Sequence, residues 1–228
     1  KRDKSNMNKL NHIAFIMDGN GRWGKKRKKG RNFGHLKGVE TVKKIVTSSL
    51  KLKIPYITFY VFSSENWNRP KKEISYLFKL INNYFLKEID NVVSQGVKIN
   101  IIGEINRLKL NVKKTLIESM KLTKKNKKII VNLAINYGSK NEILNASKKT
   151  KKLNLKNFEN NLYTKSTPHP DILIRTGGHS RLSNFMLWQL AYSELYFLKK
   201  LWPDFNLNDL KKIKRKFKKS KRNFGAVL

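Results

Sequence analysis

The stretch His12-Ile-Ala-Phe-Ile-Met-Asp-Gly-Asn-Gly-Arg-Trp-Gly24 joins a run of apolar residues to a glycine-rich turn. Apolar residues at consecutive positions are typical of a strand that is covered on both faces, as in parallel sheets, so we expect a buried strand over His12–Met17. The turn that follows places a carboxylate, Asp18, and an arginine, Arg22, among glycines. Because open parallel sheets bind ligands at the carboxyl ends of their strands, this stretch predicts both an α/β fold and the location of its site.

Short apolar runs and amphipathic segments alternate along the rest of the chain, which is typical of α/β proteins. We expect a single domain over residues 1–228, with a central, mostly parallel six-stranded sheet flanked by helices, and flexible ends at 1–11 and 221–228. The polar segment Lys151–Pro170 is expected to be a mobile connection. The expected strands are His12–Met17, Tyr56–Phe62, Val97–Ile102, Lys128–Ile135, Asp171–Ile174 and Glu194–Leu198. The expected helices span residues 35–52, 74–92, 106–124, 139–151, 182–192 and 207–219.

The helix expected at 74–92 has one broad apolar face that is rich in aromatic side chains. This face could be ordinary core, or it could be the wall of a hydrophobic tunnel. A tunnel wall differs from a core only in lacking a packing partner, so the sequence leaves both interpretations open. The face consists of Ile74, Leu77, Phe78, Ile81, Tyr84, Phe85, Ile89 and Val92.

Composition excludes several classes of protein. The 228 residues contain no Cys, which removes disulfides, thiolate nucleophiles and Cys-ligated zinc, and four scattered His argue against a dedicated zinc site. Any metal is expected to be a hard ion held by oxygen. No apolar stretch approaches the roughly 20 residues that a membrane span needs, and no signal peptide opens the chain. Because the first residue is Lys, targeting to a plastid or other organelle by a preceding segment stays open.

The chain is strongly basic, with 51 Lys and Arg against 15 Asp and Glu, a formal net charge of +36. Lysine and asparagine are spread evenly, so we attribute most of this charge to compositional drift. Arginine is rarer, and half of the ten arginines fall in turns rich in Gly, Ser, Asn or Trp, where a planar guanidinium can bind phosphate oxygens bidentately. These five are Arg22, Arg31, Arg69, Arg175 and Arg181.

Three clusters follow expected strands: Asp18–Gly24, Ser63–Pro70 and Arg175–Phe185. Each combines Arg with small hydroxyl or amide side chains, and the first and last add glycines, which suits the binding of two phosphorylated ligands. The first cluster formally matches the dinucleotide fingerprint Gly-x-Gly-x-x-Gly, but the basic run Lys25–Arg31 separates it from the next expected helix, so we reject that match. A phosphate-binding Walker loop is also rejected, because no Gly-Lys-Ser/Thr follows. We expect a loop whose backbone amides, Arg22 and Arg31 hold a diphosphate beside Asp18.

Five motifs occur in order over His12 to Gly225: HIAFIMDGNGRW (His12–Trp23), RNFGH (Arg31–His35), FSSENWNRP (Phe62–Pro70), DILIRTGGHSRLSNFMLW (Asp171–Trp188) and SELYFLKKLWPDF (Ser193–Phe205). In these motifs the chain resembles the cis-prenyltransferase family, specifically bacterial-type undecaprenyl diphosphate synthases. The resemblance implies a homodimeric enzyme that condenses isopentenyl diphosphate repeatedly onto farnesyl diphosphate with Mg²⁺. The long-chain product is expected to associate with a membrane, so the protein is expected to be cytoplasmic and peripheral to that membrane.

The resemblance also implies roles for individual residues. Asp18 would bring magnesium to a diphosphate and assist its departure, Glu194 would be a second metal ligand, and Asn66 would assist proton removal or orient a water or phosphate oxygen. The family's substrate-binding positions fall here on Gly19, Asn20, Gly21, Arg22, Trp23, Arg31, His35, Ser63, Ser64, Glu65, Trp67, Arg69, Arg175, Arg181, Leu182 and Ser183.

Some assignments keep an alternative. Glu73 could cap its helix or belong to the site. Trp67 could pack in the core or close the site over the substrate. His12, His169 and Trp202 are expected to be structural. His179 stands where family members usually carry Glu, which removes a negative charge near Arg181. The tail Lys221–Gly225 resembles a family segment that reaches the partner subunit's active site.

Two other functional classes fit less well. An RNA-binding module would explain the charge but not the separate Gly/Arg loops, so no specific nucleic-acid partner is expected. A catalytically silent partner subunit would be expected to lose Asp18 or the Arg175 cluster, and this chain keeps both.

Overall fold

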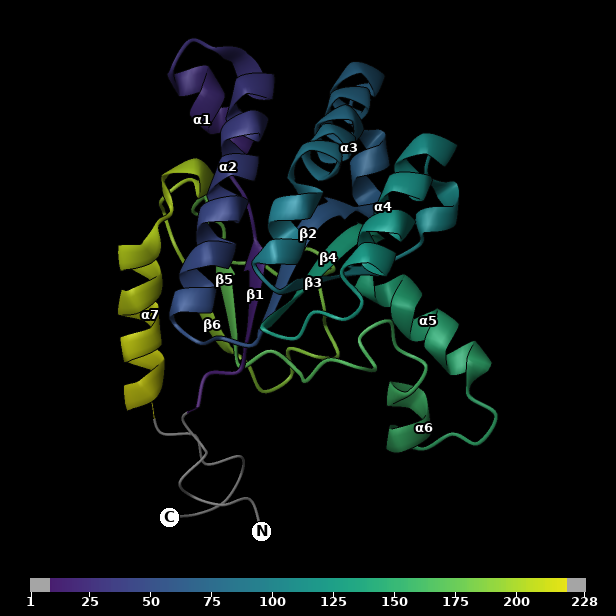
Figure 1. Ribbon diagram of the computed structural model, residues 1–228. Coiled ribbons are helices and arrows are strands. Elements are labelled where there is room, and N and C mark those ends of the chain that lie inside the picture. Colours follow the sequence, from purple (N-terminus) through teal and green to yellow (C-terminus); the bar gives the residue numbers. More distant parts are fainter. Residues whose placement is uncertain (1–8, 221–228) are drawn as a thin grey trace.

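The computed structural model describes residues 9–220, and within them six strands form one sheet (Figure 1). The strand order is β3-β4-β2-β1-β5-β6, and all neighbouring pairs are parallel. The single α/β domain is therefore confirmed, with a sheet that is parallel throughout where a mostly parallel one was expected. The strands are β1 (His12–Ile16), β2 (Tyr56–Ser63), β3 (Val97–Ile102), β4 (Ile129–Tyr137), β5 (Ile172–Arg175) and β6 (Glu194–Phe197).

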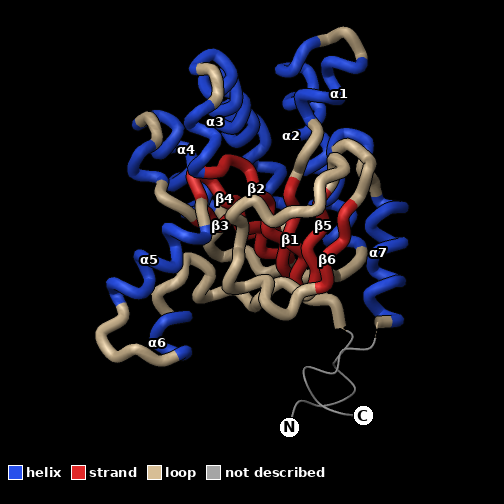
Figure 2. Tube along the Cα trace, turned by 180° about the vertical axis from the view of Figure 1, so that it is seen from behind, coloured by secondary structure: helices blue, strands red, loops and turns tan. Residues whose placement is uncertain are grey.

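Helices α1 to α4 and α7 cover one face of the sheet, and loops cross the other, with α5 and α6 packed beside these loops (Figures 1 and 2). The larger apolar core, which includes Phe15, Phe59, Phe85 and Trp202, belongs to the helix-covered face. The helices are α1 (Asn20–Lys26), α2 (Gly30–Lys51), α3 (Lys71–Ser94), α4 (Leu110–Leu122), α5 (Ser139–Lys149), α6 (Leu155–Glu159) and α7 (Leu207–Lys219), with shorter 3₁₀ turns η2 (Ser64–Asn68), η3 (Ile105–Arg107) and η4 (Trp202–Asp204). None of the helices in residues 9–220 is long and apolar enough to cross a membrane.

The helix predicted over residues 182–192 was wrong, because this segment is a series of turns. Ser183, Asn184 and Met186 have φ values of 51°, 59° and 47°, in the left-handed region. A right-handed helix needs negative φ at every residue, so these three residues cannot be part of one. In the left-handed region Cβ crowds a backbone carbonyl oxygen, which Asn tolerates better than Ser or Met does. The apolar residues Phe185, Met186 and Leu190 of this segment are buried, but they lie on a loop.

The first cluster contains a helix that the sequence analysis missed. Helix α1 begins at Asn20, among the glycines, so the absence of such a helix was a wrong reason for rejecting the dinucleotide fingerprint. Helices α1 and α2 approach so closely that a Cβ on Gly34 would lie 1.9 Å from the Asn20 carbonyl oxygen, and one on Gly24 would lie 2.0 Å from that of Gly30. The glycines therefore serve close helix packing.

Two segments expected to be mobile are packed where the structure describes them. In the expected flexible end, Leu10 is buried in the core and the Asn11 amide donates to Asp171 Oδ2 at 2.7 Å. The segment 151–170 carries α6, whose Phe158 packs with Leu162 in a small apolar cluster. The other expected flexible end, 221–228, and the tail motif Lys221–Gly225 lie outside the described residues.

His12 and Trp202 are both fully buried, and Trp202 Nε1 donates to the Gly38 carbonyl at 2.9 Å, while its ring also lines an apolar cavity described below. His12 is fully buried; its Nδ1 donates to the Pro168 carbonyl at 2.6 Å, so its Nε2 accepts from the Thr58 hydroxyl at 2.7 Å. Burial lowers the pKa of His12 to about 4, because an imidazolium there would lose its hydration. His169 lies 3.6 Å from Glu159, away from the clusters of the first, second and fifth strands.

Candidate active site

The three predicted clusters meet at the carboxyl ends of β1, β2 and β5. Register pairs Ile16 with both Tyr60 and Arg175, so the residues after these strands converge on one pocket of about 660 Å³. Fourteen of the predicted site residues line this polar pocket: Asp18, Gly19, Asn20, Gly21, Arg22, Arg31, His35, Ser63, Glu65, Asn66, Arg69, Arg175, Arg181 and Ser183.

Asp18 lies between two arginines at the centre of the pocket. Its Oδ1 accepts from Arg22 Nη2 and its Oδ2 from Arg175 Nη2, each at 3.1 Å. Gly177 lies against this group, since a Cβ there would come within 2.6 Å of Arg22 Nη2 and 2.9 Å of Asp18 Cγ. The glycine thus leaves room for the carboxylate and its arginine partners.

Arg175 is the most buried arginine of the pocket, with a side chain only 5% exposed. Its Nη1 donates to the Ser183 hydroxyl at 2.7 Å and to the Arg181 carbonyl oxygen. Arg175 therefore fixes both the carboxylate of Asp18 and the loop that follows β5. Arg181 itself is exposed and makes no ion pair with the described residues, in keeping with a His at position 179 in place of Glu.

A second charged cluster surrounds Glu73 in the first turn of α3. Arg31 binds its carboxylate with Nε at 3.0 Å and Nη2 at 2.9 Å, Arg69 donates at 3.2 Å, and His35 Nε2 lies 3.4 Å away. The hydrogen bonds from Arg31 lower the pKa of Glu73, with the charge of Arg69 adding to the effect. Glu73 lies in the first turn of α3, but its side chain makes no cap hydrogen bond there. Its carboxylate instead binds side chains that line the polar pocket, which favours the alternative that it belongs to the site.

Two buried polar atoms beside the pocket have no hydrogen-bond or ion-pair partner among residues 9–220. They are Asn20 Oδ1 and Arg175 Nε, and both residues line the polar pocket. Buried polar groups are almost always paired in native proteins. Their clustering here indicates a site that a polar ligand or water completes.

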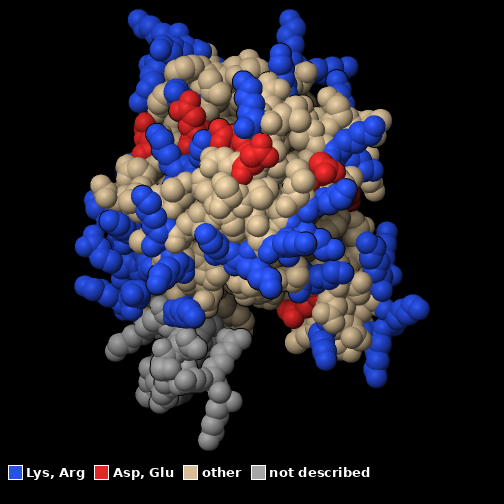
Figure 3. Space-filling model, viewed as in Figure 1, with Lys and Arg blue, Asp and Glu red and all other residues tan. Residues whose placement is uncertain are grey.

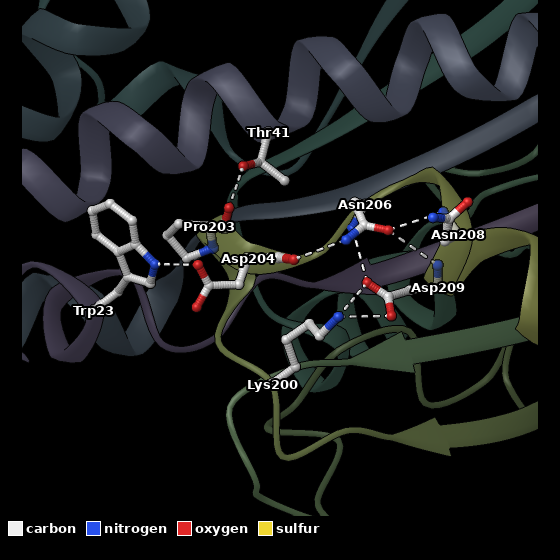
Figure 4. Close-up of polar contacts among 8 residues, drawn as sticks. All are labelled: Trp23, Thr41, Lys200, Pro203, Asp204, Asn206, Asn208 and Asp209. Atoms are coloured by element: carbon white, nitrogen blue, oxygen red, sulfur yellow. Dashed lines mark hydrogen bonds and ion pairs between the residues drawn. The ribbon is translucent and has the colours of Figure 1, made fainter.

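Trp23 does not line the pocket, although the family resemblance placed it among the substrate-binding residues. Its Nε1 donates to Asp204 Oδ1 at 2.6 Å, which ties α1 to η4 (Figure 4). The same turn is tied to α2 by a hydrogen bond from the Thr41 hydroxyl to the Pro203 carbonyl. The Trp23 ring also stacks on Phe33. Trp23 therefore holds α1, whose first residues line the polar pocket, against η4.

Three further predicted residues also point elsewhere. Trp67 packs against Phe62 and Phe78, and its Nε1 donates to Asn136 Oδ1 at 2.8 Å, which favours its packing alternative. Ser64 lines a separate small pocket beside Trp67. Leu182 packs in the apolar cluster on the loop-covered face.

Glu194 is not brought to Asp18 within this chain. It pairs with Ile172 at the amino-terminal edge of the sheet, whereas Asp18 follows the carboxyl end of β1. Ile172 in turn pairs with Ile13, five residues before Asp18. At about 3.3 Å per residue, the two carboxylates belong to opposite edges of the sheet.

Asn66, the expected aid to proton removal, uses its carbonyl to stabilise its own turn. Its Oδ1 accepts from the Ser63 backbone amide at 3.2 Å, while the Ser63 hydroxyl binds the Asn66 backbone amide. Only the amide nitrogen is left for a ligand. An amide nitrogen can donate a hydrogen bond but cannot accept a proton.

An apolar cavity of about 140 Å³ lies beside the polar pocket, between α2, α3 and the sheet. The two share Met17, Asn20, His35, Val61 and Leu77 as lining residues, so they are adjacent. The predicted aromatic face of α3 contributes five residues to its lining: Leu77, Ile81, Tyr84, Phe85 and Val92. Ile74 and Phe78 pack in the core without lining the cavity, so the face is partly core and partly cavity wall, and the tunnel stays a prediction.

Six lining residues of the polar pocket were not among the predicted site residues, and two of these six are polar, Tyr60 and Asn184. The Tyr60 hydroxyl donates to the carbonyls of Tyr137 and Ser183, at 3.2 and 3.3 Å. Tyr60 belongs to β2, in which polar and apolar residues do not alternate. The sequence therefore does not indicate which face of the sheet the Tyr60 side chain lies on. Asn184 is adjacent to Ser183 in the same motif, which was the available signal.

The donor set fits a hard cation that shares a diphosphate. Among the described residues no group of three or more His, Asp or Glu could hold a metal ion. Mg²⁺, however, commonly uses one or two carboxylates together with substrate phosphates and water. Asp18, with a side chain 26% exposed, supplies such a carboxylate.

Comparison with known proteins agrees with this geometry. The Prenyltransf family model, described as undecaprenyl diphosphate synthase, matches residues 16–225. The chain belongs to this family. An isoprenyl transferase of Clostridium perfringens is 43% identical over 227 residues, covering 95% of this chain and 90% of its own length. One from Rickettsia bellii is 44% identical over 225 residues, covering 96% and 99%.

Two solved structures extend the agreement to the fold of this prenyltransferase. Lavandulyl diphosphate synthase from Lavandula x intermedia, in complex with dimethylallyl diphosphate, is 31% identical with a TM-score of 0.92 and covers 96% of this chain and 99% of its own. A probable undecaprenyl diphosphate synthase from Campylobacter jejuni is 32% identical with a TM-score of 0.83, covering 96% and 100%. The chain is thus a transferase of prenyl groups.

Proposed function

We propose that this prenyltransferase condenses isopentenyl diphosphate repeatedly, in cis geometry, with an allylic diphosphate. Farnesyl diphosphate is the proposed primer, and the proposed product is a long-chain polyprenyl diphosphate such as undecaprenyl diphosphate. The adjacency of a polar, arginine-lined pocket and an apolar cavity carries this proposal. An amphiphile with a diphosphate head and a hydrocarbon tail needs both environments side by side.

In the proposed reaction the allylic C–O bond breaks and the diphosphate leaves with the electron pair. The double bond of isopentenyl diphosphate then forms the new C–C bond, and one proton is lost from that substrate. Arg22, Arg31 and His35 would bind the allylic diphosphate, while Arg175, Arg181 and Ser183 would bind the other. We propose Mg²⁺ as the cofactor, held by Asp18 and diphosphate oxygens; when bound, it supplies positive charge to the leaving group.

The growing product must enlarge the apolar cavity. At about 140 Å³ it is close to an engineered cavity of about 150 Å³ that binds benzene, so it holds little more than one isoprene unit in this conformation. Helices α2 and α3 form two of its walls, and we propose that they move apart as the chain grows. The cavity would then act as the tunnel predicted from the sequence.

We further propose a homodimer in the cytoplasm whose product brings it to a membrane surface. Tyr192 and Leu195, beside and within the outermost strand β6, are 72% and 44% exposed, which supports an interface at this edge. No specific nucleic-acid partner is proposed. The retention of Asp18 and both arginine groups in one pocket argues against a silent subunit.

The test is incubation with farnesyl diphosphate, labelled isopentenyl diphosphate and Mg²⁺, followed by sizing of the lipid product and determination of its double-bond geometry. We expect a ladder that ends in long, cis-extended chains. Val46→Phe, which places bulk in the cavity, should shorten the product, whereas Val93→Phe, at a position that does not line it, should not. Absence of chain extension, or trans geometry, would refute the proposal.

A further inference from the structure

The loop after β5 is held in a shape that its own residues do not favour. Ser183, Asn184 and Met186 all have left-handed backbone conformations, within a segment that delivers Arg181 and Ser183 to the polar pocket. Such conformations persist only where surrounding contacts impose them, and they concentrate at functional sites. The contacts that impose this shape are therefore part of the site's construction.

Asn184 makes most of these contacts. Its main-chain carbonyl accepts from the Ser139 amide at 2.8 Å, and its side-chain Oδ1 accepts from the Lys140 amide at 2.9 Å. These are the first two backbone amides of α5, which begins after Gly138 without a side-chain cap of its own. Asn184 thus caps a distant helix and is fixed by it.

The side-chain nitrogen of Asn184 is bound by Glu65. Asn184 Nδ2 donates to Glu65 Oε1 at 2.7 Å, which joins the loop after β5 to the turn after β2. Gly138 allows this approach, because a Cβ there would lie 2.9 Å from Asn184 Nδ2. Both side-chain polar groups of Asn184 and its main-chain carbonyl are therefore bound by two elements that lie more than 40 residues away in the sequence.

A carboxylate such as Glu65 is unexpected in a pocket that is proposed to bind diphosphates. A carboxylate repels the anionic diphosphates that the surrounding arginines attract, so direct contact with substrate would weaken binding. Burial alone would raise the pKa of Glu65, but the hydrogen bonds from Asn184 and from its own turn outweigh burial and lower it. Its charge is thus used to hold Asn184.

Ser183 transmits this arrangement to the pocket. It is bonded to Asn184 in the chain, its hydroxyl accepts from Arg175 Nη1, and Arg175 in turn binds Asp18. A shift of Asn184 would displace the Ser183 hydroxyl and leave a buried guanidinium donor without its partner. The effect would reach the arginines proposed to bind isopentenyl diphosphate.

We propose that Asn184 and Glu65 are a pair of positioning residues, which lock the loop after β5 in the conformation that receives one of the two diphosphates. The inference rests on the proposed function, since that function names the ligand. It also changes the role of Glu65, which the family resemblance placed among substrate contacts.

An exchange of donor and acceptor tests the pair. Asn184→Asp keeps the shape and both helix-capping acceptors but sets a carboxylate against Glu65. We expect the KM for isopentenyl diphosphate to rise about tenfold or more, because a hydrogen bond to a charged group is replaced by repulsion, while the KM for farnesyl diphosphate changes less than about twofold. Glu65→Gln alone should have a small effect, since its amide oxygen can still accept from Asn184.

The double variant Asn184→Asp with Glu65→Gln restores one donor and one charged acceptor in the same place. It should return the KM for isopentenyl diphosphate to within about twofold of the unmodified protein. Asn141→Asp is the matched control, because it adds the same charge near the same end of α5 at an exposed position outside the polar pocket. It should leave KM unchanged.

Titration calorimetry with inorganic diphosphate separates this inference from the proposed function. If the unmodified protein neither binds diphosphate nor extends chains, the proposed function fails. If the unmodified protein binds diphosphate and extends chains, then an unchanged KM and an unchanged diphosphate affinity in Asn184→Asp overturn the proposal that Asn184 and Glu65 are positioning residues. Failure of the double variant to recover, while its thermal unfolding matches that of the unmodified protein, also overturns it.

Discussion

At the scale of single residues, Asp18 meets two demands at once. It neutralises Arg175, which is almost fully buried, and it presents the central carboxylate of the polar pocket. A buried charge without its partner is costly, so part of any effect of removing Asp18 is structural. Substitutions that preserve its shape are therefore needed to isolate the chemistry.

Asp18→Asn keeps the shape and one acceptor for Arg175 but removes the negative charge proposed to hold Mg²⁺. We expect kcat to fall about 10³-fold or more, near 4 kcal/mol of transition-state stabilisation, as measured by single-turnover product formation. Asp90→Asn, at an exposed position on α3 outside the polar pocket, should leave kcat unchanged. A loss of only a few-fold in Asp18→Asn would contradict the role.

The two arginines after β5 should respond differently to replacement by lysine. Arg181 is exposed, so Arg181→Lys should mainly raise the KM for isopentenyl diphosphate through loss of the bidentate fork. Arg175 binds three protein groups from a buried position, so Arg175→Lys should lower the thermal midpoint as well as activity. Equal thermal midpoints for both variants would argue against the structural part of the Arg175 role.

At the scale of elements, the sequence predicted the strands and helices that hydrophobic periodicity determines. It missed the backbone conformations that tertiary contacts impose. The strand Val97–Ile102 and the helix 207–219 match the structure to the residue. The segment 182–192 has apolar residues at helical spacing, but capping of α5 by Asn184 holds its backbone left-handed. Helix α1 was missed because its glycines lower local propensity, and only packing against α2 explains them.

The same limit applies to the site. Motif order and strand ends were enough to bring fourteen predicted residues to one pocket. Trp23 and Trp67 share those motifs, yet their indole groups bind Asp204 and Asn136. Which side of a turn a side chain occupies depends on partners far along the chain, and a single sequence does not identify them.

His12 links neighbouring strands through buried hydrogen bonds, and its pKa makes that link sensitive to pH. The folded pKa of about 4 lies below the ordinary value of 6.5, so the unfolded chain takes up a proton that the folded chain does not. The stabilisation is complete above pH 6.5 and is lost as pH falls toward 4. Its full size is about 3 to 4 kcal/mol, from about 1.4 kcal/mol for each pH unit between the two values, and about 3 kcal/mol of it is lost by pH 4.

Urea unfolding between pH 7 and pH 4 measures the pH-dependent stabilisation that His12 contributes. The reference protein is the variant His12→Gln, whose side chain at this position cannot titrate. The free energy of unfolding of the unmodified protein should fall by about 3 kcal/mol more than that of the variant over this range. The carboxylates with lowered pKa values, Glu65, Glu73 and Glu88, also lose stabilisation in acid, but they do so in both proteins. Parallel pH dependences would show that His12 does not titrate as inferred.

At the scale of the whole molecule, the charge of +36 surrounds a site for anions. Lys and Arg side chains are scattered over the whole face seen in Figure 3, and they outnumber the acidic residues on it. Such a field attracts diphosphates from a distance, but salt screens it over about 10 Å at 0.1 M. The arginines of the pocket act at contact distance and are screened much less. The rate at which the protein encounters a diphosphate should therefore depend strongly on salt, whereas the contacts of the bound diphosphate should depend on it weakly.

Raising NaCl from about 0.05 M to 0.5 M should lower kcat/KM for both diphosphates by about tenfold, while kcat changes less than about twofold. Exchange of Lys211, Lys212, Lys216 and Lys218 for Glu isolates the long-range part, because these residues are exposed on α7 and none lines the polar pocket. At low salt this variant should have a lower kcat/KM than the unmodified protein. At high salt the kcat/KM values of the two proteins should converge, because salt screens the same long-range attraction that the four substitutions remove. Identical salt curves for the two proteins would assign the salt effect to the pocket arginines and leave the overall charge without a role in substrate capture.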